Sequence, residues 1–488
     1  MREAQQKIKA EYIVTGLVLA AMSYFIFFQR LDTFQIRPWD EAIYANNAYE
    51  MWQSGKYFML TNHFVNDLYN TKPLLPFWTQ VLSFSLFGFN EMAVRLPSAV
   101  ASMFTALMVF MFVRRYASAT WGWTAFFVLV TSAGFVHFHT ARTGDMDALL
   151  TLFLTGSCLA FFNLLQEESP KRNSILFYLL FLALAFASKT FAALLFLPAQ
   201  IVLLVYYKKL AAIVKHRAFY AGTAIALLIA LLPLVLRNIE QPGYLVRTFS
   251  FDALRVANVV ENHNEPFGFY FINFFTWRFP TWIVVSFLGL IMMVRSPETS
   301  TRKLGIAIAA SLISYLLIIS FSVTKLEWYD MPLYPLMAIA AGYLVWQVLL
   351  LAGIEKYKWS VRQAWLLGVF FIPAFYAVKR SNDNTISPGD QKAEELSAYL
   401  FRAGRTDIDV DKWIVIQDWH RQCLDFYQRK FAENNQQLRI VPAVDSLRPG
   451  DHVLAAGDSI KDLIRGQFET REEQRYNDVY AFEIVSMK

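Results

Sequence analysis

Two adjacent carboxylates stand just after the first strongly apolar run of the chain, in the stretch IRPWDEAIYANNAYEMW that begins at Ile36. Asp40 and Glu41 can be interpreted in two ways. They can begin a helix, because Pro38 and acidic residues suit the start of a helix. They can also be a catalytic pair, in which Asp40 is a general base and Glu41 supports it. These residues alone do not decide between the two.

The composition is that of a polytopic α-helical membrane protein. The 488 residues are 56% hydrophobic and 17% charged, whereas about a quarter of the residues of a soluble domain are charged. Several segments approach or exceed the roughly 20 apolar residues that span a bilayer core. The net charge of +6 is therefore attributed to membrane topology, and no nucleic-acid partner is expected.

About 11 membrane spans, and at most 13, are expected. If the N-terminus is cytoplasmic, every loop predicted to lie inside is basic, as the positive-inside rule requires. This alternation requires a break at Lys189, between two short apolar runs. The predicted spans cover residues 11–28, 92–113, 120–137, 147–165, 174–188, 190–207, 218–236, 267–294, 303–321, 332–354 and 363–379.

The same topology places the unusual polar residues of the membrane part outside, at the ends of spans. Polar groups at membrane depth are costly and tend to line a site. We therefore expect an active site that opens to the outer face. The polar residues that gather there include Asp40, Glu41, Lys72, His139, Arg142, Asp145, Asp147, Lys189, Glu261, His263, Lys325 and Glu327.

Two domains are predicted. Residues 1–379 form a transmembrane domain whose first outside loop, 29–91, contains two segments with faces suited to helices lying in the interface plane. Residues 380–488 are polar and mixed in composition and are expected to form a small extracytoplasmic α/β domain. Its predicted strands are DKWIVIQ, QLRIVPA, DHVLAAG and VYAFEIV, with helical patterns between them.

The order of the polar motifs carries a resemblance. PWDEAIYA is followed by YNTKPLLPFW, ARTGDMDALLTLF, ASKTFAALLFLP, ENHNEPFGFYF and TKLEWYDMPLYPLMA. This series, over roughly residues 10–350, resembles the lipid-linked-sugar glycosyltransferases of the GT-C superfamily. Within it, the chain is similar to the bacterial aminoarabinose transferases and the protein O-mannosyltransferases.

The resemblance implies an activity and a location. It implies an inverting transfer of a sugar from a polyprenyl (undecaprenyl) phosphate carrier to a glycolipid or protein acceptor. The reaction would take place on the outer face of the bacterial cytoplasmic (inner) membrane.

The resemblance also implies roles for the acidic pair and for the cations. Asp40 matches the acidic motif of the first outside loop and would act as base or orient the acceptor, with Glu41 positioning it or belonging to the helix start. Lys72 matches a phosphate-binding lysine; the alternative is an interfacial lysine that reaches lipid headgroups. Lys325 matches another recurrent lysine.

Two further cations can serve the donor phosphate. Negative charge accumulates on the phosphate as it leaves, so cations aimed at its oxygens stabilise the transition state. Arg142 and Lys189 are candidates for this role with Lys72 and Lys325. The family usually has glycine after the lysine at Lys189, where this chain has Thr190.

The remaining candidates concern the sugar or the acceptor. Asp147 would accept sugar hydroxyls or fix a neighbouring cation, and Tyr329 follows Lys325 in the expected rhythm. Asp145 is expected to be a solvated loop acid or a helix cap. Glu261 and His263 are acceptor-site candidates.

A required metal is not predicted. Part of the family holds a divalent metal with a histidine at the place of His263 and a glutamate just before the lysine at Lys72. This chain has Thr71 at the latter position, and two residues do not make a metal site. No cofactor is therefore expected to be required.

Two alternatives stay open. A transporter or lipid flippase would show polar residues at the bilayer midplane and weak symmetry between halves, whereas the charged residues here stand at span ends. A protein O-glycosyltransferase would share its donor chemistry with a glycolipid-modifying enzyme, so the site does not identify the acceptor.

Overall fold

The computed structural model describes residues 13, 15–137, 139–260, 263–353, 373, 391–406, 409–416, 421–476 and 479–488. The chain divides into two compact units. The first comprises Met1–Gln29, Asn66–Pro76 and Pro97–Asn382; the second comprises Arg30–Val65, Phe77–Leu96 and Asp383–Lys488. The predicted domain boundary between residues 379 and 380 lies outside the described residues.

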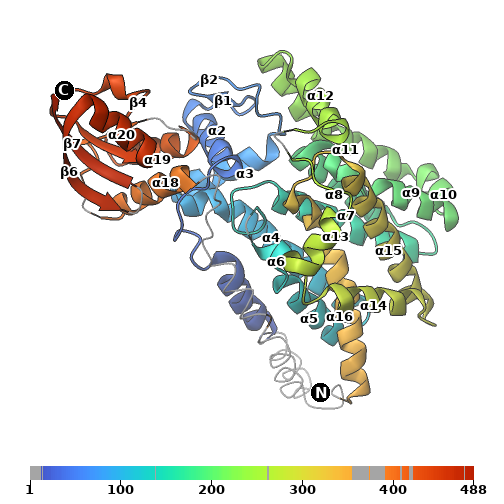
Figure 1. Ribbon diagram of the computed structural model, residues 1–488. Coiled ribbons are helices and arrows are strands. Elements are labelled where there is room, and N and C mark those ends of the chain that lie inside the picture. Colours follow the sequence, from blue (N-terminus) through green and yellow to red (C-terminus); the bar gives the residue numbers. More distant parts are fainter. Residues whose placement is uncertain are drawn as a thin grey trace. The chain divides into compact units, whose positions relative to one another are not determined.

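The first unit is a bundle of apolar helices (Figure 1). Its long helices arise from runs of leucine and alanine, which favour helix, together with phenylalanine, which buries well. Its elements are η1 (Tyr24–Phe28), α4 (Glu91–Tyr116, of which Glu91–Leu96 belong to the second unit), α5 (Ala119–Val130), α6 (Ala133–Val136), α7 (Asp147–Gln166), α8 (Arg172–Lys189), η2 (Thr190–Leu194), α9 (Leu197–Tyr206), α10 (Leu210–Lys215), α11 (Arg217–Glu240), α12 (Tyr244–Ala257), α13 (Phe269–Asn273), η3 (Phe274–Arg278), α14 (Ile283–Val294), α15 (Thr299–Phe321), η4 (Glu327–Leu333) and α16 (Tyr334–Leu351).

Within the described residues, six helices are long and apolar enough to cross a membrane, or seven if a bent pair is one span. They correspond to the predicted spans at 92–113, 147–165, 174–188, 218–236, 303–321 and 332–354, and the bent pair to 267–294. That pair turns by 114° between Arg278 and Ile283. The predicted spans at 11–28, 120–137 and 190–207 appear as shorter apolar helices, and the span at 363–379 lies outside the described residues, apart from Pro373.

Helix α7 lies at the centre of this bundle. Of its apolar segment, 83% is buried inside the protein, compared with 11% for α11. Helix α7 packs against α8, and α16 packs against α5 and α14. Because α7 is enclosed by protein, the polar group at its first residue, Asp147, faces other side chains rather than lipid.

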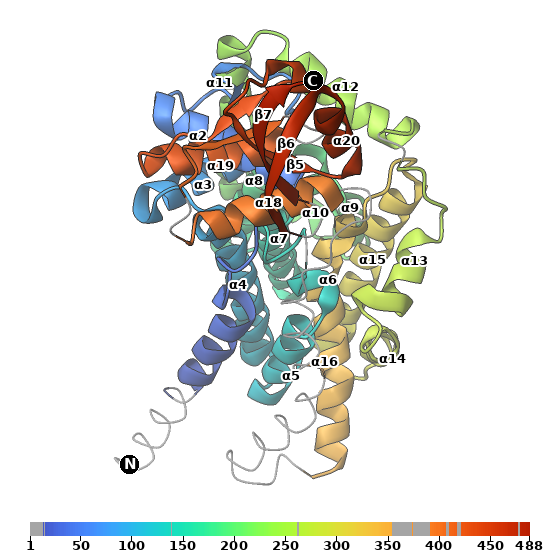
Figure 2. The ribbon, with the colours of Figure 1, turned by 60° about the vertical axis from the view of Figure 1, so that its left-hand side comes forward.

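The second unit contains a small mixed sheet and the helices of the first outside loop (Figure 2). The helices expected in that loop are present as α2 and α3; their orientation in a membrane stays a prediction. The elements are α2 (Asp40–Ser54), β1 (Thr61–Asn62), β2 (Val65–Asn66), α3 (Leu75–Phe87), α18 (Gln391–Ala403), β3 (Trp413–Ile416), α19 (Arg421–Glu433), β4 (Arg439–Val441), η7 (Val444–Ser446), β5 (His452–Ala456), α20 (Asp458–Gln467), β6 (Phe468–Tyr476) and β7 (Val479–Met487).

The sheet has the strand order β4-β3-β5-β7-β6 in the described residues. Strand β3 pairs in parallel with β4 and β5, while β7 pairs antiparallel with β5 and β6. All four predicted strands are present, as β3, β4, β5 and β7. Strand β6 was not predicted, because its sequence FETREEQRY is almost entirely polar; such charge suits an edge strand that must not pair with another chain.

Candidate active site

A pocket of about 140 Å³ lies in the first unit where the ends of several helices meet. Four of the residues singled out from the sequence line it together: Lys72, Asp147, Lys189 and Tyr329. Asp147 begins α7, Lys189 ends α8, and Tyr329 lies in η4. The pocket therefore brings together residues far apart in the sequence: Lys72 and Tyr329 are 257 positions apart.

Two of the residues that line the pocket, Lys189 and Asp147, form an ion pair. The Lys189 ammonium lies 2.7 Å from Asp147 Oδ1 and 2.9 Å from Oδ2. Their side chains are 13% and 5% exposed, so each charge needs the other. Lys189 Nζ also lies 4.7 Å from the centre of the Tyr329 ring, a cation–π distance. Asp147 thus fixes a neighbouring cation, one of the two roles expected for it.

Arg255 is a pocket residue that sequence reasoning missed. It lines the pocket from α12, and its Nη1 donates a hydrogen bond of 2.7 Å to the Tyr329 hydroxyl. Its guanidinium carbon lies 4.5 Å from the centre of the Phe251 ring. The pocket is therefore lined by three cations, Lys72, Lys189 and Arg255. The only sequence signal for Arg255 was its position in a segment predicted to lie outside, 237–266.

The loop that presents Lys72 is held by a fully buried arginine. Arg237, at the end of α11, is 0% exposed. Its guanidinium donates to the backbone carbonyls of Lys72 at 2.5 Å and of Asn70 at 2.7 Å. The same group lies 3.9 Å from the centre of the Tyr244 ring. Because a buried guanidinium needs all its partners, this contact fixes the backbone beneath Lys72.

A second buried network supports the element that carries Tyr329. Asp330 is 0% exposed and lies 2.6 Å from Arg278 Nη2. The Tyr334 hydroxyl donates to Asp330 Oδ2 at 2.6 Å, and Arg278 also donates to the carbonyl of Gly134 at 3.1 Å. These bonds join η4 to η3 and α6, so the backbone of η4 is held on two sides.

The chain turns sharply at Thr190, the position at which the resemblance implies a glycine. Thr190 has φ of +32° and ψ of −120°, in the region that favours glycine and that costs a β-branched residue about 1–3 kcal/mol. Its hydroxyl donates to Asp252 Oδ2 at 2.8 Å. The strained turn is therefore tied to α12, the helix that also carries Arg255.

Two substitutions separate these effects. Thr190→Val keeps the strained backbone but loses the hydroxyl, so we expect the free energy of unfolding to fall by about 1 kcal/mol. Thr190→Gly loses the same bond but relieves strain of about 1–3 kcal/mol, so it should be the more stable of the two variants. Thermal unfolding in detergent measures the order; a glycine variant that melts below the valine variant contradicts it.

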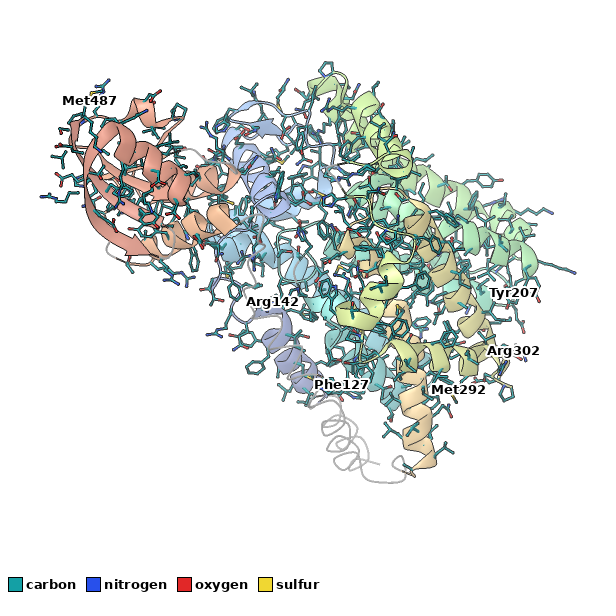
Figure 3. The ribbon with its side chains drawn as sticks, in the orientation of Figure 1. Phe127, Arg142, Tyr207, Met292, Arg302 and Met487 are labelled. Carbon is teal, nitrogen blue, oxygen red and sulfur yellow. The ribbon has the colours of Figure 1, made fainter. Side chains whose placement is uncertain are left out.

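Two predicted phosphate cations do not line this pocket. The Arg142 guanidinium, labelled in Figure 3, donates to the carbonyls of Ile26 at 2.8 Å and of Gln29 at 2.6 Å, at the end of η1. The Lys325 ammonium donates to the carbonyls of Glu265 at 2.8 Å and of Ser322 at 2.6 Å. The pKa of Lys325 is lowered, because the effect of burial is larger than the opposing effect of the Glu265 charge. Their roles toward phosphate stay predictions.

The pair Glu261 and His263 is placed only in part. Glu261 lies outside the described residues. The backbone of His263 donates to the carbonyl of Val260 at 3.1 Å and accepts from the Lys325 amide at 3.3 Å. His263 therefore belongs to the turn that leads to Lys325, and a role in sugar or acceptor binding is untested.

Asp145 was expected to be either a solvated loop acid or a helix cap, and it is not solvated. It is 4% exposed. Its Oδ2 lies 3.1 Å from His139 Nδ1, and the His139 ring stacks on Trp328 with ring centres 3.7 Å apart. The contact joins the loop before α7 to η4, which the sequence did not indicate.

Asp40 and Glu41 lie in the second unit. Helix α2 begins at Asp40, so the helix-start interpretation holds for both residues. Glu41 is 1% exposed and forms a buried ion pair with Arg95, with Arg95 Nε 2.8 Å from Glu41 Oε1. Glu41 also accepts from the Arg37 amide at 2.8 Å. Glu41 therefore fixes the start of α2, while a catalytic role for Asp40 stays a prediction.

Arg95 extends this anchor to the preceding loop. Its guanidinium donates to the carbonyls of Leu31 at 2.8 Å, Phe34 at 3.0 Å and Gln35 at 2.6 Å. The loop that leads to Asp40 is thus held by one arginine. Neither this contact nor the pairing of Glu41 with a residue 54 positions away could be read from local sequence.

Comparison with protein families matches residues 71–236 to the family described as dolichyl-phosphate-mannose-protein mannosyltransferase. Among curated proteins, the chain is 28% identical over 362 residues to the undecaprenyl phosphate-alpha-4-amino-4-deoxy-L-arabinose arabinosyl transferase of Aeromonas hydrophila, covering 71% of this chain and 62% of that protein. It is 32% identical over 158 residues to the protein of that name in Shewanella sediminis, covering 32% of this chain and 28% of that protein.

Among solved structures, the chain is similar to that of ArnT from Cupriavidus metallidurans bound to undecaprenyl phosphate. The TM-score is 0.69 at 16% identity, over 96% of this chain and 97% of that one. It is also similar to the archaeal oligosaccharyltransferase AglB from Archaeoglobus fulgidus, with a TM-score of 0.53 at 11% identity, over 86% of this chain and 63% of that one. At these identities the likeness concerns the fold. Together, these matches confirm that the chain resembles the GT-C glycosyltransferases that use polyprenyl-phosphate-linked sugars, and the bacterial aminoarabinose transferases among them.

Proposed function

We propose that this chain is an inverting glycosyltransferase that moves a sugar from a polyprenyl-phosphate carrier, undecaprenyl phosphate, to an acceptor. The observation that carries the proposal is the pocket lined by Lys72, Lys189 and Arg255, with Asp147 paired to Lys189. A phosphate leaving group needs concentrated positive charge and no general acid, because it is already a weak base. The similarity to aminoarabinose transferases supports the same donor class.

The proposed reaction is a single displacement. The acceptor hydroxyl oxygen attacks the anomeric carbon, and the bond from that carbon to the carrier phosphate breaks with its electron pair going to the phosphate oxygen. Lys72 and Arg255 stabilise the charge that develops there. Asp40 takes the proton from the acceptor hydroxyl, which raises the nucleophilicity of its oxygen, and Glu41 positions Asp40.

The other predicted roles remain part of the proposal. Arg142 and Lys325 are assigned to the donor phosphate together with Lys189. Asp147, Tyr329, Glu261 and His263 are assigned to the sugar or the acceptor. No metal is assigned, because Thr71 stands where the metal-binding branch has a glutamate.

The membrane arrangement is proposed with the same reaction in view. We propose about 11 spans in the bacterial inner membrane, a cytoplasmic N-terminus and an extracytoplasmic C-terminal domain at residues 380–488. Every loop placed inside by this arrangement is basic, which supports it. The acceptor is then a glycolipid or a protein segment at the outer face.

The test is a mass measurement on envelope glycolipids and glycoproteins. Cells that lack the gene, cells that carry it, and cells that carry the Asp40→Asn variant are compared. The proposal predicts one sugar that is present only with the unchanged gene. Loss of that sugar from a glycolipid or from a protein distinguishes the two acceptor classes, and the family match over residues 71–236 keeps the protein acceptor in view.

The same measurement can contradict the proposal. If all three strains show identical glycolipids and glycoproteins, the transfer activity is excluded under those conditions and a transporter is favoured. If the Asp40→Asn strain retains the sugar, the chain is a transferase but Asp40 is not its base.

A further inference from the structure

A second cavity lies at the other end of α7 and α8 from the active-site pocket. Its volume is about 1160 Å³, and its lining residues come from α4, α7, α8 and the segment between α7 and α8. Helix α7 runs from Asp147, which lines the pocket, to Gln166, which lines the cavity. Twenty helical residues span about 30 Å, the thickness of a bilayer core. The two hollows therefore lie toward opposite ends of a helix that is long enough to cross a bilayer core.

The wall of the cavity near the helix ends is basic. Arg115 comes from the last turn of α4, and Lys171 and Arg172 come from the start of α8; all three are exposed. The cavity wall also contains Glu167, whose carboxylate accepts from the Lys171 amide at 2.8 Å and from the Ser174 hydroxyl at 2.6 Å. These donors are neutral, so the rim has three cations and one carboxylate, and its net charge stays positive. The start of α8 adds the positive end of a helix dipole.

The end of the bundle around this cavity is well braced. The Lys209 ammonium donates to the backbone carbonyls of Glu167 and Glu168. The Gln166 amide donates to the Tyr116 hydroxyl at 2.9 Å and to the Ser300 carbonyl at 3.0 Å. Figure 3 labels Tyr207 and Arg302 from the segments that meet here. Hydrogen bonds between neighbouring segments therefore hold the helix ends that surround the cavity.

The deeper walls of the cavity are apolar. They are formed by Met108 and Phe112 of α4, Leu159 of α7, and Phe177 and Phe181 of α8. Phe181 follows the first residue of α8 by nine positions, which is about 14 Å along the helix toward the bilayer centre. A small soluble anion would use only the basic rim. A molecule with an anionic head and hydrocarbon chains matches both the rim and the walls.

We infer that this cavity binds an anionic phospholipid, with its phosphate at Arg115, Lys171 and Arg172 and an acyl chain along the apolar walls. The lipid comes from the leaflet opposite the active-site pocket. Basic pockets between transmembrane helices bind the headgroups of anionic lipids in this way. The site is separate from the donor pocket and takes part in no step of the proposed transfer.

The test uses the full-length protein in detergent and native mass spectrometry, with phosphatidylglycerol and phosphatidylcholine as probes. The unchanged protein should retain phosphatidylglycerol preferentially. The triple variant Arg115→Gln, Lys171→Gln, Arg172→Gln should bind phosphatidylglycerol roughly 100- to 200-fold more weakly, because each cation near a membrane surface contributes about 1 kcal/mol, which is roughly a fivefold effect. The matched control is Lys215→Gln, Arg217→Gln, Arg295→Gln, three exposed cations that do not line the cavity and should leave binding unchanged.

A second variant tests the apolar part without changing charge. Asn163 is exposed and lines the cavity from α7, so Asn163→Trp should fill it and expel the lipid while keeping all three cations. The inference is overturned if phosphatidylcholine is retained as well as phosphatidylglycerol, or if lipid binding is unchanged in either variant. It is also overturned if the control triple variant weakens binding equally, or if inorganic phosphate displaces the lipid. Size-exclusion profiles check that the variants remain folded.

Discussion

Replacing Lys72 by alanine is expected to lower the rate of sugar transfer by about 10²–10³-fold, the usual effect of removing one group that stabilises developing negative charge. Lys72 lines the pocket that also contains Lys189 and Arg255. Of these, Lys189 is neutralised by Asp147. Lys72 and Arg255 are therefore the two pocket cations that we assign to the leaving phosphate. The measurement is the initial rate at which purified protein transfers sugar from a polyprenyl-phosphate donor to an acceptor.

The control for this experiment is Lys56→Ala. Lys56 is an exposed lysine of the same predicted outside loop and does not line the pocket, so its loss should change the rate by less than about twofold. Arg255→Ala should resemble Lys72→Ala, since both remove a pocket cation. A Lys72→Ala variant that transfers sugar at nearly the unchanged rate would show that the lysine only reaches lipid headgroups, which is the alternative that its sequence position left open.

Two of the site residues that sequence reasoning found, Asp147 and Lys189, are charged groups at the end of an apolar run. Asp147 precedes the run of α7, and Lys189 ends that of α8. At such a place the cost of desolvation makes a polar group conspicuous. That Asp147 and Lys189 pair with each other depends on how α7 packs against α8, which the sequence does not encode locally.

Arg255 and Arg237 were missed for two different reasons. Arg255 lies in a segment between two predicted spans, so the sequence does not distinguish it from an ordinary residue of an outside loop. Arg237 stands one residue beyond a predicted span, where an arginine is common at an interface. In the structure its guanidinium is fully buried against the backbone of Lys72. Only tertiary packing distinguishes such an arginine from one that faces water.

Helix ends were predicted less well than helix positions for a related reason. The break expected at Lys189 is present, but as a strained Thr190 followed by the short helix η2 rather than as two complete spans. The predicted span at 267–294 is divided by a turn of 114°. Apolar composition predicts that a segment is buried in protein or lipid, whereas its direction depends on the neighbours it packs against.

The ion pair between Asp147 and Lys189 provides the second large effect. Asp147→Ala should destabilise the protein by about 3–5 kcal/mol, because it leaves the Lys189 ammonium buried without its counter-charge. Adding Lys189→Met removes that charge as well, so the double variant should recover most of the lost stability. The measurement is thermal unfolding in detergent for the two single variants and the double variant, which gives the coupling energy of the pair.

Transfer activity in the same variants separates support of the fold from a direct role at the site. If the pair only holds α7 to α8, the double variant should recover activity together with stability. If Lys189 or Asp147 contacts the donor, the double variant should be stable and nearly inactive, which is the result we expect because both residues line the pocket beside Lys72 and Arg255. If the losses of stability in the two single variants simply add in the double variant, the charges of Asp147 and Lys189 do not depend on each other. The ion pair would then not be what stabilises this part of the pocket.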